Sequence, residues 1–253
     1  MKKNPKIVIN YFLRKFKYQI VKVKKYQLPF DMDKGFHDIY KKAKPFTKTN
    51  AERLYAMYKA AEYVSKANIP GAIVECGVYK GGSTMSALLK LVQMKKTDKQ
   101  VYLYDTYTGM DEPGERDVTV KRDDPAWTRW KSAQKDGYNT WCYASVEEVR
   151  DNMIATGYPE DKFTFIKGKV EETIPDQMPE KIAVLRLDTD FYSSTSHEMK
   201  HLFPLLSPGG VLIIDDYGCF KGSRDAVDEY FAESGHKILL HRVDGAGRVG
   251  IKI

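Results

Sequence analysis

The apolar positions of the chain fall into two patterns, one typical of helices and one typical of buried strands. Between residues 49 and 67, apolar side chains recur at spacings of three and four, which predicts an amphipathic helix that Thr49 or Asn50 can cap. Further along, short uninterrupted apolar runs bounded by glycine, proline or polar residues predict buried strands. We expect these strands at residues 72–76, 101–104, 163–166, 182–187 and 211–214.

Helical segments separate the expected strands, at residues 83–94, 198–206 and 224–234. Uninterrupted apolar strands that alternate with helices predict an α/β fold, with a mostly parallel sheet covered by helices on both faces. The chain ends in two strand-like segments, 237–243 and 248–253, around the turn sequence Asp-Gly-Ala-Gly. We therefore expect a C-terminal antiparallel hairpin at one edge of the sheet.

One long segment, residues 111–143, interrupts this alternation after the second expected strand. The segment is polar, yet it carries Trp127, Trp130, Tyr138 and Trp141. Because structureless loops of this length are uncommon unless they serve a function, we expect an insertion or a lid after the second strand.

The composition is that of a soluble globular protein. Of the 253 residues, 42% are hydrophobic and 30% are charged, and the mean hydropathy is −0.50, which excludes collagen-like, disordered and membrane-spanning chains. The three cysteines, Cys76, Cys142 and Cys219, show no CxxC spacing, so we expect neither a disulfide framework nor a structural zinc site. This cysteine usage fits a reducing compartment, and we expect a cytoplasmic location.

The net charge of +7 is concentrated at the N-terminus. Residues 1–50 hold 14 lysines and arginines against three aspartates, whereas the remaining chain holds 27 against 31 acidic residues, so no nucleic-acid affinity is expected of it. Residues 1–25, the N-terminal arm, contain nine basic residues and no acid around a short apolar run. The arm either contacts an anionic surface, such as the inner face of a membrane, or packs on a second subunit of a homo-oligomer.

A glycine loop follows the first expected strand, where residues 75–83 read ECGVYKGGS. Glycine lets the backbone pass close to a ligand, and a helix N-terminus offers free N–H groups. The spacing matches neither the dinucleotide pattern nor the P-loop. Glu75 lies at the end of this strand and Asp105 at the end of the next, where an acid can accept hydrogen bonds from both hydroxyls of a ribose. The sequence therefore favours a nucleoside-bearing ligand at this edge of the sheet.

Two further strands end in pairs of acids. Asp188 and Asp190 follow the fourth expected strand, and Asp215 and Asp216 follow the fifth. Because the carboxyl ends of neighbouring parallel strands meet at one edge, these carboxylates would converge and repel one another, and a hard divalent cation would neutralise them. We expect a metal site here, with Asp190 bracing the loop rather than binding the metal.

Other roles for these side chains stay open. The acids could instead cap the following helices or pair with arginines such as Arg186 and Arg248. His197 and His201 follow at a spacing of four and could act as a base, although paired helix histidines more often lie at the surface or pack against neighbours.

Several of these motifs, in this order and spacing, resemble the macrocin O-methyltransferase (TylF) family. The matching segments are TKT…ERLY (47–55), GAIVECGVYKGGS (71–83), YDTYTGM (104–110), SVEEV (145–149), IKG…ETIP (166–175), LRLDTDFY (185–192) and SPGGVLIIDDY (207–217). The resemblance covers roughly residues 45–253. It implies that these residues form a methyltransferase domain, preceded by a basic N-terminal extension over residues 1–44.

The resemblance implies a fold, an activity and a set of site residues. The fold would be a class I methyltransferase, a Rossmann-like α/β sheet whose last strands form a hairpin. Magnesium would be bound by Asp188, Asp215 and Asp216, and Asp188 is also implied as the catalytic proton acceptor. The residues implied for binding S-adenosylmethionine are Thr47, Lys48, Glu75, Gly77, Val78, Gly81, Gly82, Asp105, Thr106, Gly109, Ser145, Lys167 and Gly168.

The activity implied is the transfer of a methyl group to a hydroxyl, in particular of a sugar in a nucleotide sugar, a surface glycan or a glycosylated natural product. One alternative is a nicotinamide-dependent oxidoreductase, which the missing G-x-G-x-x-G pattern and the acidic cluster disfavour. A second alternative is a non-catalytic protein that binds a nucleoside ligand. Such a protein would be expected to have lost one of the three implied metal ligands, and all three are present.

Overall fold

The computed structural model describes Ile9, Leu13, Lys17 and residues 28–253. The expected N-terminal arm therefore lies almost entirely outside the described residues. The chain forms two compact units, and the second of them, Asp33–Ile253, contains the central sheet and the helices that cover it. In the described part of the chain, no helix combines the length and the apolar character needed to cross a membrane.

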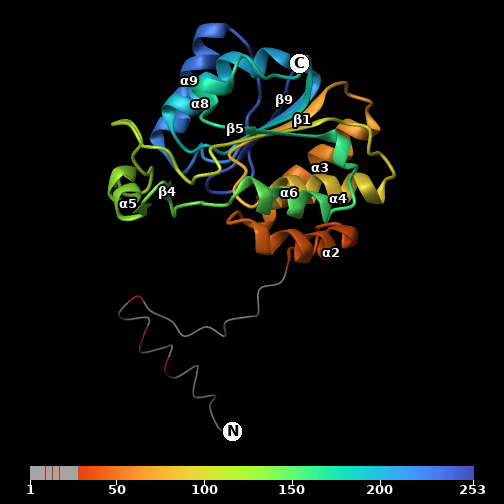
Figure 1. Cartoon of the computed structure of the whole chain (residues 1–253), viewed down its shortest axis with the longest axis horizontal. Coiled ribbons are helices and arrows are strands. Elements are labelled where there is room, and N and C mark those ends of the chain that lie inside the picture. The colour runs from red at the N-terminus through yellow and green to blue at the C-terminus, as the bar shows by residue number, and fades with distance from the viewer. Residues whose placement is uncertain (1–8, 10–12, 14–16, 18–27) are drawn as a thin grey trace. The chain divides into compact units, whose positions relative to one another are not determined.

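A seven-stranded sheet lies at the centre of this unit, in the strand order β5-β2-β1-β6-β7-β9-β8 (Figure 1). In chain order the strands are β1 (Ala72–Cys76), β2 (Val101–Asp105), β5 (Phe163–Lys167), β6 (Ile182–Leu187), β7 (Leu206–Ile214), β8 (His241–Arg242) and β9 (Arg248–Ile251). The five strands from β5 to β7 are parallel, and β9 pairs antiparallel with both β7 and β8. The expected Rossmann-like α/β sheet with a terminal hairpin is confirmed.

Helices cover both faces of the sheet (Figure 1). One face carries α2 (Lys34–Ala43), α3 (Ala51–Lys66), α4 (Gly82–Gln93) and α6 (Val146–Ile154), and the other carries α7 (Val170–Thr173), α8 (Tyr192–His201) and α9 (Lys221–Ser234). Short 3₁₀ turns occur at Lys44–Phe46, Glu160–Lys162 and Phe203–Leu205.

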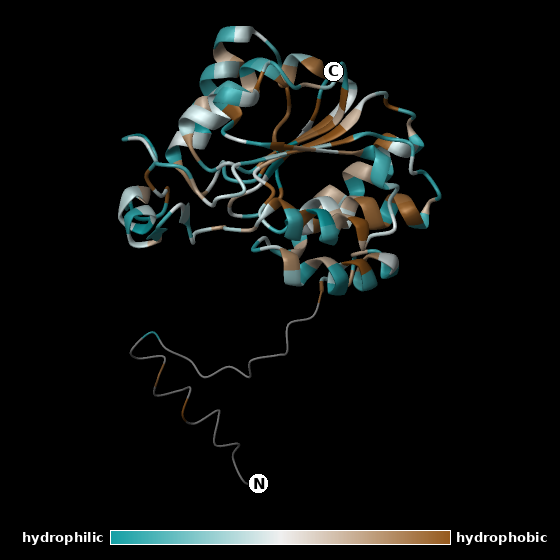
Figure 2. Ribbon diagram, in the orientation of Figure 1, coloured by the Kyte–Doolittle hydropathy of each residue, from teal (hydrophilic) through white to brown (hydrophobic). Residues whose placement is uncertain are grey.

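Alternate strand residues enter the two cores, as the pleat of a strand requires. Ile73 of β1 packs into the core under α3 and α4, whereas its neighbour Val74 packs into the core under α8 and α9. Both side chains are fully buried. Figure 2 shows the central strands as the most hydrophobic part of the ribbon. This two-sided burial explains why the strands are continuous apolar runs in the sequence.

Helix α2 was not expected from the sequence. It buries Phe36, Ile39 and Ala43 along one side and packs on α4. The Phe36 ring contacts the rings of Tyr55 and Tyr58 of α3 at centroid distances of 5.0 and 5.2 Å. The compact unit therefore begins before residue 45, where the sequence placed the start of the domain.

Helix α8 begins at Tyr192 and ends at His201, whereas the sequence predicted a helix over 198–206. The first turn is rich in serine and threonine, which have weak helix propensity, so its pattern gave no helical signal. Its N-terminus is stabilised from elsewhere, because the Oδ1 atom of Asp117 accepts a hydrogen bond from the backbone N–H of Tyr192 at 2.8 Å.

Strand β7 begins at Leu206 rather than at Val211. Leu206 pairs with Ile182 and Val211 pairs with Val184, so residues 207–210 form an irregularity opposite a single residue of β6. The Ser-Pro-Gly-Gly stretch, which reads as a turn in the sequence, is therefore a bulge within the strand.

The insertion, residues 111–143, contains α5 (Ala126–Ser132) and a small hairpin of β3 (Gln134–Lys135) and β4 (Tyr138–Asn139). It extends beyond one side of the sheet (Figure 1). Its aromatic residues form a separate cluster, in which Trp141 packs with Phe191 and Phe220 from the loops after β6 and β7. The insertion is therefore a folded structure that packs against the carboxyl edge of the sheet.

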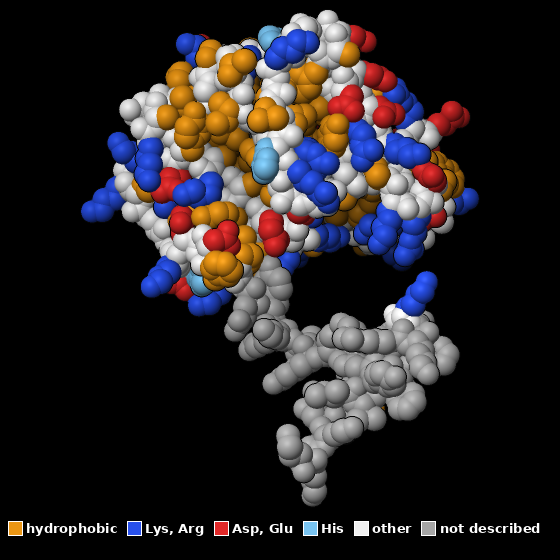
Figure 3. Space-filling view, turned by 180° about the vertical axis from the view of Figure 1, so that it is seen from behind, with side chains coloured by type: hydrophobic (Ala, Val, Ile, Leu, Met, Phe, Trp, Pro, Cys, Tyr) orange, Lys and Arg blue, Asp and Glu red, His pale blue; other side chains and the backbone are white. Residues whose placement is uncertain are grey.

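On the face seen from behind, acidic and basic side chains are interspersed over the described surface (Figure 3). This agrees with the balanced charge of the chain beyond its N-terminus.

The buried position of Phe36 gives a test of whether α2 belongs to the folded unit. Replacing Phe36 with alanine removes a fully buried ring from contacts with α3, so the free energy of unfolding should fall by about 3–5 kcal/mol. Urea denaturation followed by circular dichroism measures this change. Phe30→Ala is the matched control because Phe30 is fully exposed and should leave the stability unchanged. A loss below about 1 kcal/mol in Phe36→Ala would contradict the packing of α2.

Candidate active site

A cavity of about 550 Å³ lies at the carboxyl ends of the parallel strands. This volume falls within the range of roughly 300–1,000 Å³ that small-molecule sites occupy. Its walls come from the glycine loop, from the segments after β2, β5, β6 and β7, and from the insertion. We call the part beside the glycine loop the donor end, and the part bounded by Asp190, Asp216 and the insertion the acceptor end.

Gly77 allows the glycine loop to pass very close to the backbone of Asp188. Its φ is +81°, and a Cβ atom placed there would lie 2.0 Å from the carbonyl oxygen of Asp188. The backbone N–H of Asp188 in turn donates to the carbonyl of Cys76 at 2.8 Å. Only glycine fits this approach, since any other side chain would clash with the backbone that carries Asp188.

Asp105 holds the glycine loop in place. Its Oδ2 atom accepts hydrogen bonds from the N–H groups of Val78 and Tyr79 at 2.7 and 3.0 Å, and Oδ1 accepts from Tyr107 N–H at 2.7 Å and from the Thr106 hydroxyl at 3.4 Å. A carboxylate has about four acceptor positions, and backbone N–H groups fill three of them here, while only the more distant Thr106 hydroxyl approaches the fourth. Asp105 lines the cavity, so the expected ribose contact stays a prediction.

Arg186 is fully buried and binds three carboxylates from three strands. One of its terminal nitrogens donates to Glu75 Oε1 at 2.5 Å and to Asp188 Oδ2 at 2.7 Å, and the other donates to Asp215 Oδ1 at 2.6 Å. Burial lowers the pKa of Arg186, but the three carboxylates more than compensate, so the net shift is upward and the side chain stays charged. The alternative of an arginine pairing with the acids is thus realised at Arg186.

Arg248 does not take this role. Its guanidinium donates to the backbone carbonyls of Ala246 and Gly247, at 3.4 and 2.9 Å, and stacks on the Tyr217 ring.

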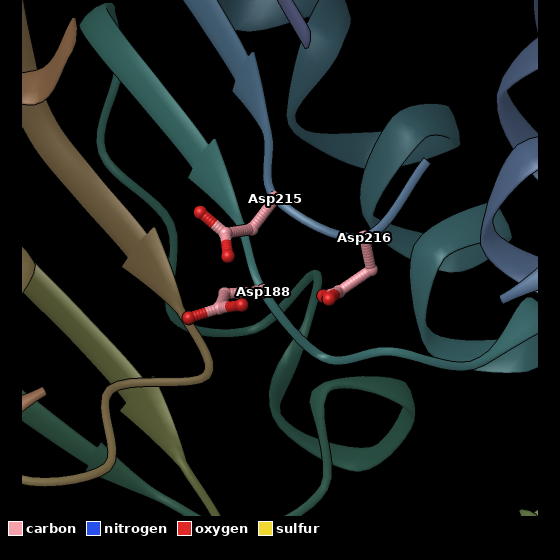
Figure 4. A group of neighbouring side chains, drawn as sticks. All are labelled: Asp188, Asp215 and Asp216. Atoms are coloured by element: carbon pink, nitrogen blue, oxygen red, sulfur yellow. The ribbon is translucent and has the colours of Figure 1, made fainter. Parts of the chain in front are cut away.

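The three expected metal ligands converge. Asp188, Asp215 and Asp216 each offer one oxygen, and these oxygens lie within 4.8 Å of one another. Figure 4 shows the three carboxylates pointing toward one another from the ends of β6 and β7. Asp215 also accepts hydrogen bonds from Arg186 and from Arg53 of α3, which leaves it lone pairs but fixes its orientation.

Asp216 supplies the strongest indication of a cation site. Its Oδ2 atom is buried and receives no hydrogen bond from any donor in the described part of the chain. Its neighbours are Asp188 and Asp190, which are carboxyl groups themselves and can donate to it only when protonated. Hard oxygen ligands with one buried oxygen unpartnered fit a magnesium-type ion.

Asp190 lies in a left-handed backbone conformation, with φ of 67°, and its side chain faces the cavity beside Asp216. Burial, followed by the negative charge of Asp188, raises the pKa of Asp190 to about 8. Burial likewise raises the pKa values of Asp188 and Asp216. Burial therefore favours the neutral form of all three carboxyl groups.

The cavity contains eight of the thirteen residues implied for the methyl donor, as well as all three implied metal ligands. The eight are Thr47, Lys48, Gly77, Val78, Asp105, Thr106, Gly109 and Gly168. The other five implied donor residues are not among the lining residues. They are Glu75, Gly81, Gly82, Ser145 and Lys167.

For three of these five residues, the structure shows another role that explains why they do not line the cavity. Glu75 is buried behind the cavity, where it accepts hydrogen bonds from Thr84 and Arg186. Gly82 begins α4 with no room for a side chain, since a Cβ atom would lie 2.7 Å from that of Thr47. Ser145 caps α6 by accepting a hydrogen bond from Glu148 N–H at 3.2 Å.

The two histidines lie away from the cavity. His197 and His201 stack on each other along α8 with a centroid distance of 4.4 Å, and Nε2 of His197 lies 2.9 Å from the carbonyl oxygen of Ile174. Neither lines the cavity, so packing is the role the structure favours for this pair.

Sequence reasoning missed several residues that line the cavity. Arg53 reaches it from α3, and Trp141, Phe191 and Phe220 form an aromatic wall at the acceptor end. Arg53 could have been found, because it belongs to the ERLY segment (52–55) that resembles the TylF family. Trp141 had a signal in the aromatic content of the insertion, but its packing with Phe191 and Phe220 did not, because the three residues come from separate loops.

Comparison with known proteins agrees with this geometry. A family model described as macrocin O-methyltransferase (TylF) matches residues 2–249. A Streptomyces olivaceus protein named 8-demethyl-8-(2,3-dimethoxy-alpha-L-rhamnosyl)-tetracenomycin-C 4'-O-methyltransferase is 32% identical over 201 residues, which cover 79% of this chain and 73% of the relative. Demethyldecarbamoylnovobiocin O-methyltransferase of Streptomyces niveus is 32% identical over 193 residues, covering 76% of this chain and 70% of the relative. The solved structure of the O-methyltransferase NovP is similar with a TM-score of 0.71 and 30% identity, over 82% of each chain.

The raised pKa of Asp190 predicts a pH dependence of stability in the cation-free protein. The folded chain holds the Asp190 proton up to about pH 8, whereas the unfolded chain releases it near pH 3.8, so stability should fall as pH rises through this window. The slope from one group reaches at most about 1.4 kcal/mol per pH unit. Urea denaturation in EDTA between pH 5.5 and 8 measures it.

Asp190→Asn is the matched variant, because its amide cannot lose a proton. The slope should become shallower in this variant, and Mg²⁺ should stabilise the unaltered protein more at pH 8 than at pH 5.5. An identical slope in both proteins would contradict the assignment.

Proposed function

The chain belongs to the macrocin O-methyltransferase (TylF) family, and from this premise we propose that it transfers the methyl group of S-adenosylmethionine to a sugar hydroxyl. The observation that carries the proposal is the contact between Gly77 and Asp188, which places a donor loop directly beside a set of converging carboxylates. The names of the relatives support a sugar or glycosylated natural product as the acceptor. Family membership also favours methyl transfer over the oxidoreductase and the non-catalytic binding protein considered from the sequence.

The reaction requires an in-line arrangement of sulfur, methyl carbon and acceptor oxygen. The bond from carbon to sulfur breaks, a bond from carbon to oxygen forms, and the hydroxyl proton leaves. Holding the two reactants in this line supplies much of the acceleration in such transfers. The rigid loop from Gly77 to Tyr79, fixed by Asp105, orients the donor in this proposal.

Asp188 is the residue we assign as proton acceptor. Arg186 binds its Oδ2 atom, so its other oxygen can face the acceptor hydroxyl. The side chain is partly exposed at the cavity, unlike the nearly buried Asp215. Asp188 therefore combines a fixed orientation with access to substrate, which a general base requires.

Magnesium is the cofactor we propose for Asp188, Asp215 and Asp216. When bound, Mg²⁺ lowers the pKa of a hydroxyl and orients its oxygen. The orphaned Asp216 oxygen and the hard donor set support this assignment. Arg53 and Arg186 hold Asp215 from both sides, so the ligand cluster keeps its shape before the ion arrives.

The donor assignment predicts that Asp105→Ala weakens the binding of S-adenosylhomocysteine. The substitution removes the expected ribose contact and releases the N–H groups of Val78 and Tyr79. Losing charge-assisted hydrogen bonds worth about 1.5–3 kcal/mol corresponds to about a tenfold to hundredfold loss of affinity, which calorimetry measures. Asp98→Ala, an exposed acid in the loop before β2 and outside the cavity, is the control and should bind as the unaltered protein does. Unchanged affinity in Asp105→Ala would refute the donor assignment.

The metal assignment predicts that Asp216→Asn weakens Mg²⁺ or Mn²⁺ binding by at least about tenfold, because one of three carboxylate ligands loses its charge. S-adenosylhomocysteine affinity should change by less than about twofold, since Asp216 lies at the acceptor end. Titration calorimetry with each ligand gives both values. Asp136→Asn, an exposed acid outside the cavity, is the control. Equal metal binding by Asp216→Asn and the control would show that the cluster does not hold the ion.

A further inference from the structure

The acceptor end of the cavity carries two basic side chains that lack an acidic partner. Lys121 and Arg129, both from the insertion, line the cavity. Neither forms an ion pair with any residue that the structure describes. Lys48, beside the glycine loop, likewise forms no ion pair with a described residue, but its ammonium group lies over the Tyr79 ring and contacts Cys142. The remaining basic side chains of the site are paired. Arg53 pairs with Asp215 and Asp244, and Lys169 pairs with Asp111 at 2.7 Å.

Arg129 lies over an aromatic surface. Its guanidinium carbon is 4.2 Å from the centroid of the Trp141 ring, and Trp141 packs edge-on against Phe191 at 6.0 Å. This cation–π contact with Trp141 helps to position the guanidinium at the acceptor end. Arg129 also acts electrostatically on Asp190, which places its charge at the acceptor end.

The backbone just before Lys121 is bonded to the loop after β7 that carries the proposed metal ligands Asp215 and Asp216. Val120 donates a backbone hydrogen bond to the carbonyl of Cys219 at 2.8 Å, and Thr119 forms a β-bridge with Phe220. Cys219 N–H in turn donates to the carbonyl of Asp216 at 2.8 Å. The ammonium group of Lys121 therefore rises from a segment bonded to the proposed metal site.

Asp117 holds the insertion rigid. It is 2% exposed, and its carboxylate accepts from Tyr192 N–H at the start of α8 and from Gly114 N–H at 2.7 Å. Its carbonyl accepts from Ala126 N–H at the start of α5. Arg116 stacks on the Tyr192 ring at 3.8 Å and pairs with acids of α9. The two cations are thus presented by a preformed wall.

Two cations without an ion-pair partner beside the proposed sugar site match a divalent anion. An arginine fork binds phosphate oxygens in pairs and lysine adds a point charge, whereas a neutral sugar would offer neither side chain a charged partner. Resting on the proposed function, we propose that the acceptor is a sugar that carries a phosphate or diphosphate group, bound by Arg129 and Lys121. The group can come from a sugar nucleotide or from a lipid-linked sugar.

Calorimetry on the full chain, saturated with S-adenosylhomocysteine and Mg²⁺, tests this assignment. The probes are UDP, farnesyl diphosphate and, as the uncharged control, uridine. We expect at least one diphosphate to bind at least about tenfold more tightly than uridine, and we expect its binding to weaken as salt is added.

Arg129→Gln and Lys121→Gln should each weaken the binding of that diphosphate by at least about tenfold. Arg122→Gln, an exposed neighbour outside the cavity, is the matched control and should change it by less than about twofold.

The outcomes separate the two sources of the phosphate. Binding of UDP supports a sugar nucleotide, and binding of farnesyl diphosphate supports a lipid-linked sugar. The proposal is overturned if neither diphosphate binds better than uridine, or if binding is insensitive to both cavity substitutions, as it would be if the metal alone held the diphosphate.

S-adenosylhomocysteine affinity is measured in every variant. If it is retained, the failure concerns the phosphate site alone, whereas its absence in the unaltered protein would refute the proposed function.

Discussion

The site depends on one buried charge, the guanidinium of Arg186. Removing an arginine from water costs several kcal/mol unless carboxylates and hydrogen bonds compensate for it. Here Glu75, Asp188 and Asp215 do so, and each stands at or just after the carboxyl end of a different strand. The same contacts lock the ends of β1, β6 and β7 into one arrangement. A single ion cluster therefore links the proposed donor site to the proposed metal site.

This cluster also sets the electrostatics of the cavity. Arg186 and Arg53 together bind both oxygens of Asp215, so that acid is compensated within the protein. Asp188, Asp190 and Asp216 are left with more negative charge than the chain neutralises, and burial raises the pKa values of all three. This excess of negative charge supports the proposed Mg²⁺ site.

In the proposed function, reaction chemistry and acceptor recognition come from different parts of the chain. The ends of the strands provide the proposed proton acceptor and metal ligands, which are held by the sheet. The insertion supplies Arg129, Lys121 and Trp141, which stand over the acceptor end. Hydrogen bonds to Asp117 connect this segment to the first turns of α5 and α8. The residues proposed for acceptor recognition therefore stand on a folded segment rather than on a free loop. Such an arrangement allows the acceptor to change through the insertion while the reaction stays the same.

The sequence by itself determined the order of the elements, the two-sided burial of the strands and the convergence of Asp188, Asp215 and Asp216. Each of these follows from local periodicity and from the rule that neighbouring parallel strands end at one edge. It could not place α8 correctly, because the cap on Tyr192 comes from Asp117, which is distant in the chain. Nor could it distinguish the buried Glu75 from the cavity-lining Gly77, or find the wall formed by Trp141, Phe191 and Phe220. Those features depend on contacts between segments far apart in sequence, and only the packed tertiary structure decides which side chains meet and which face the ligand.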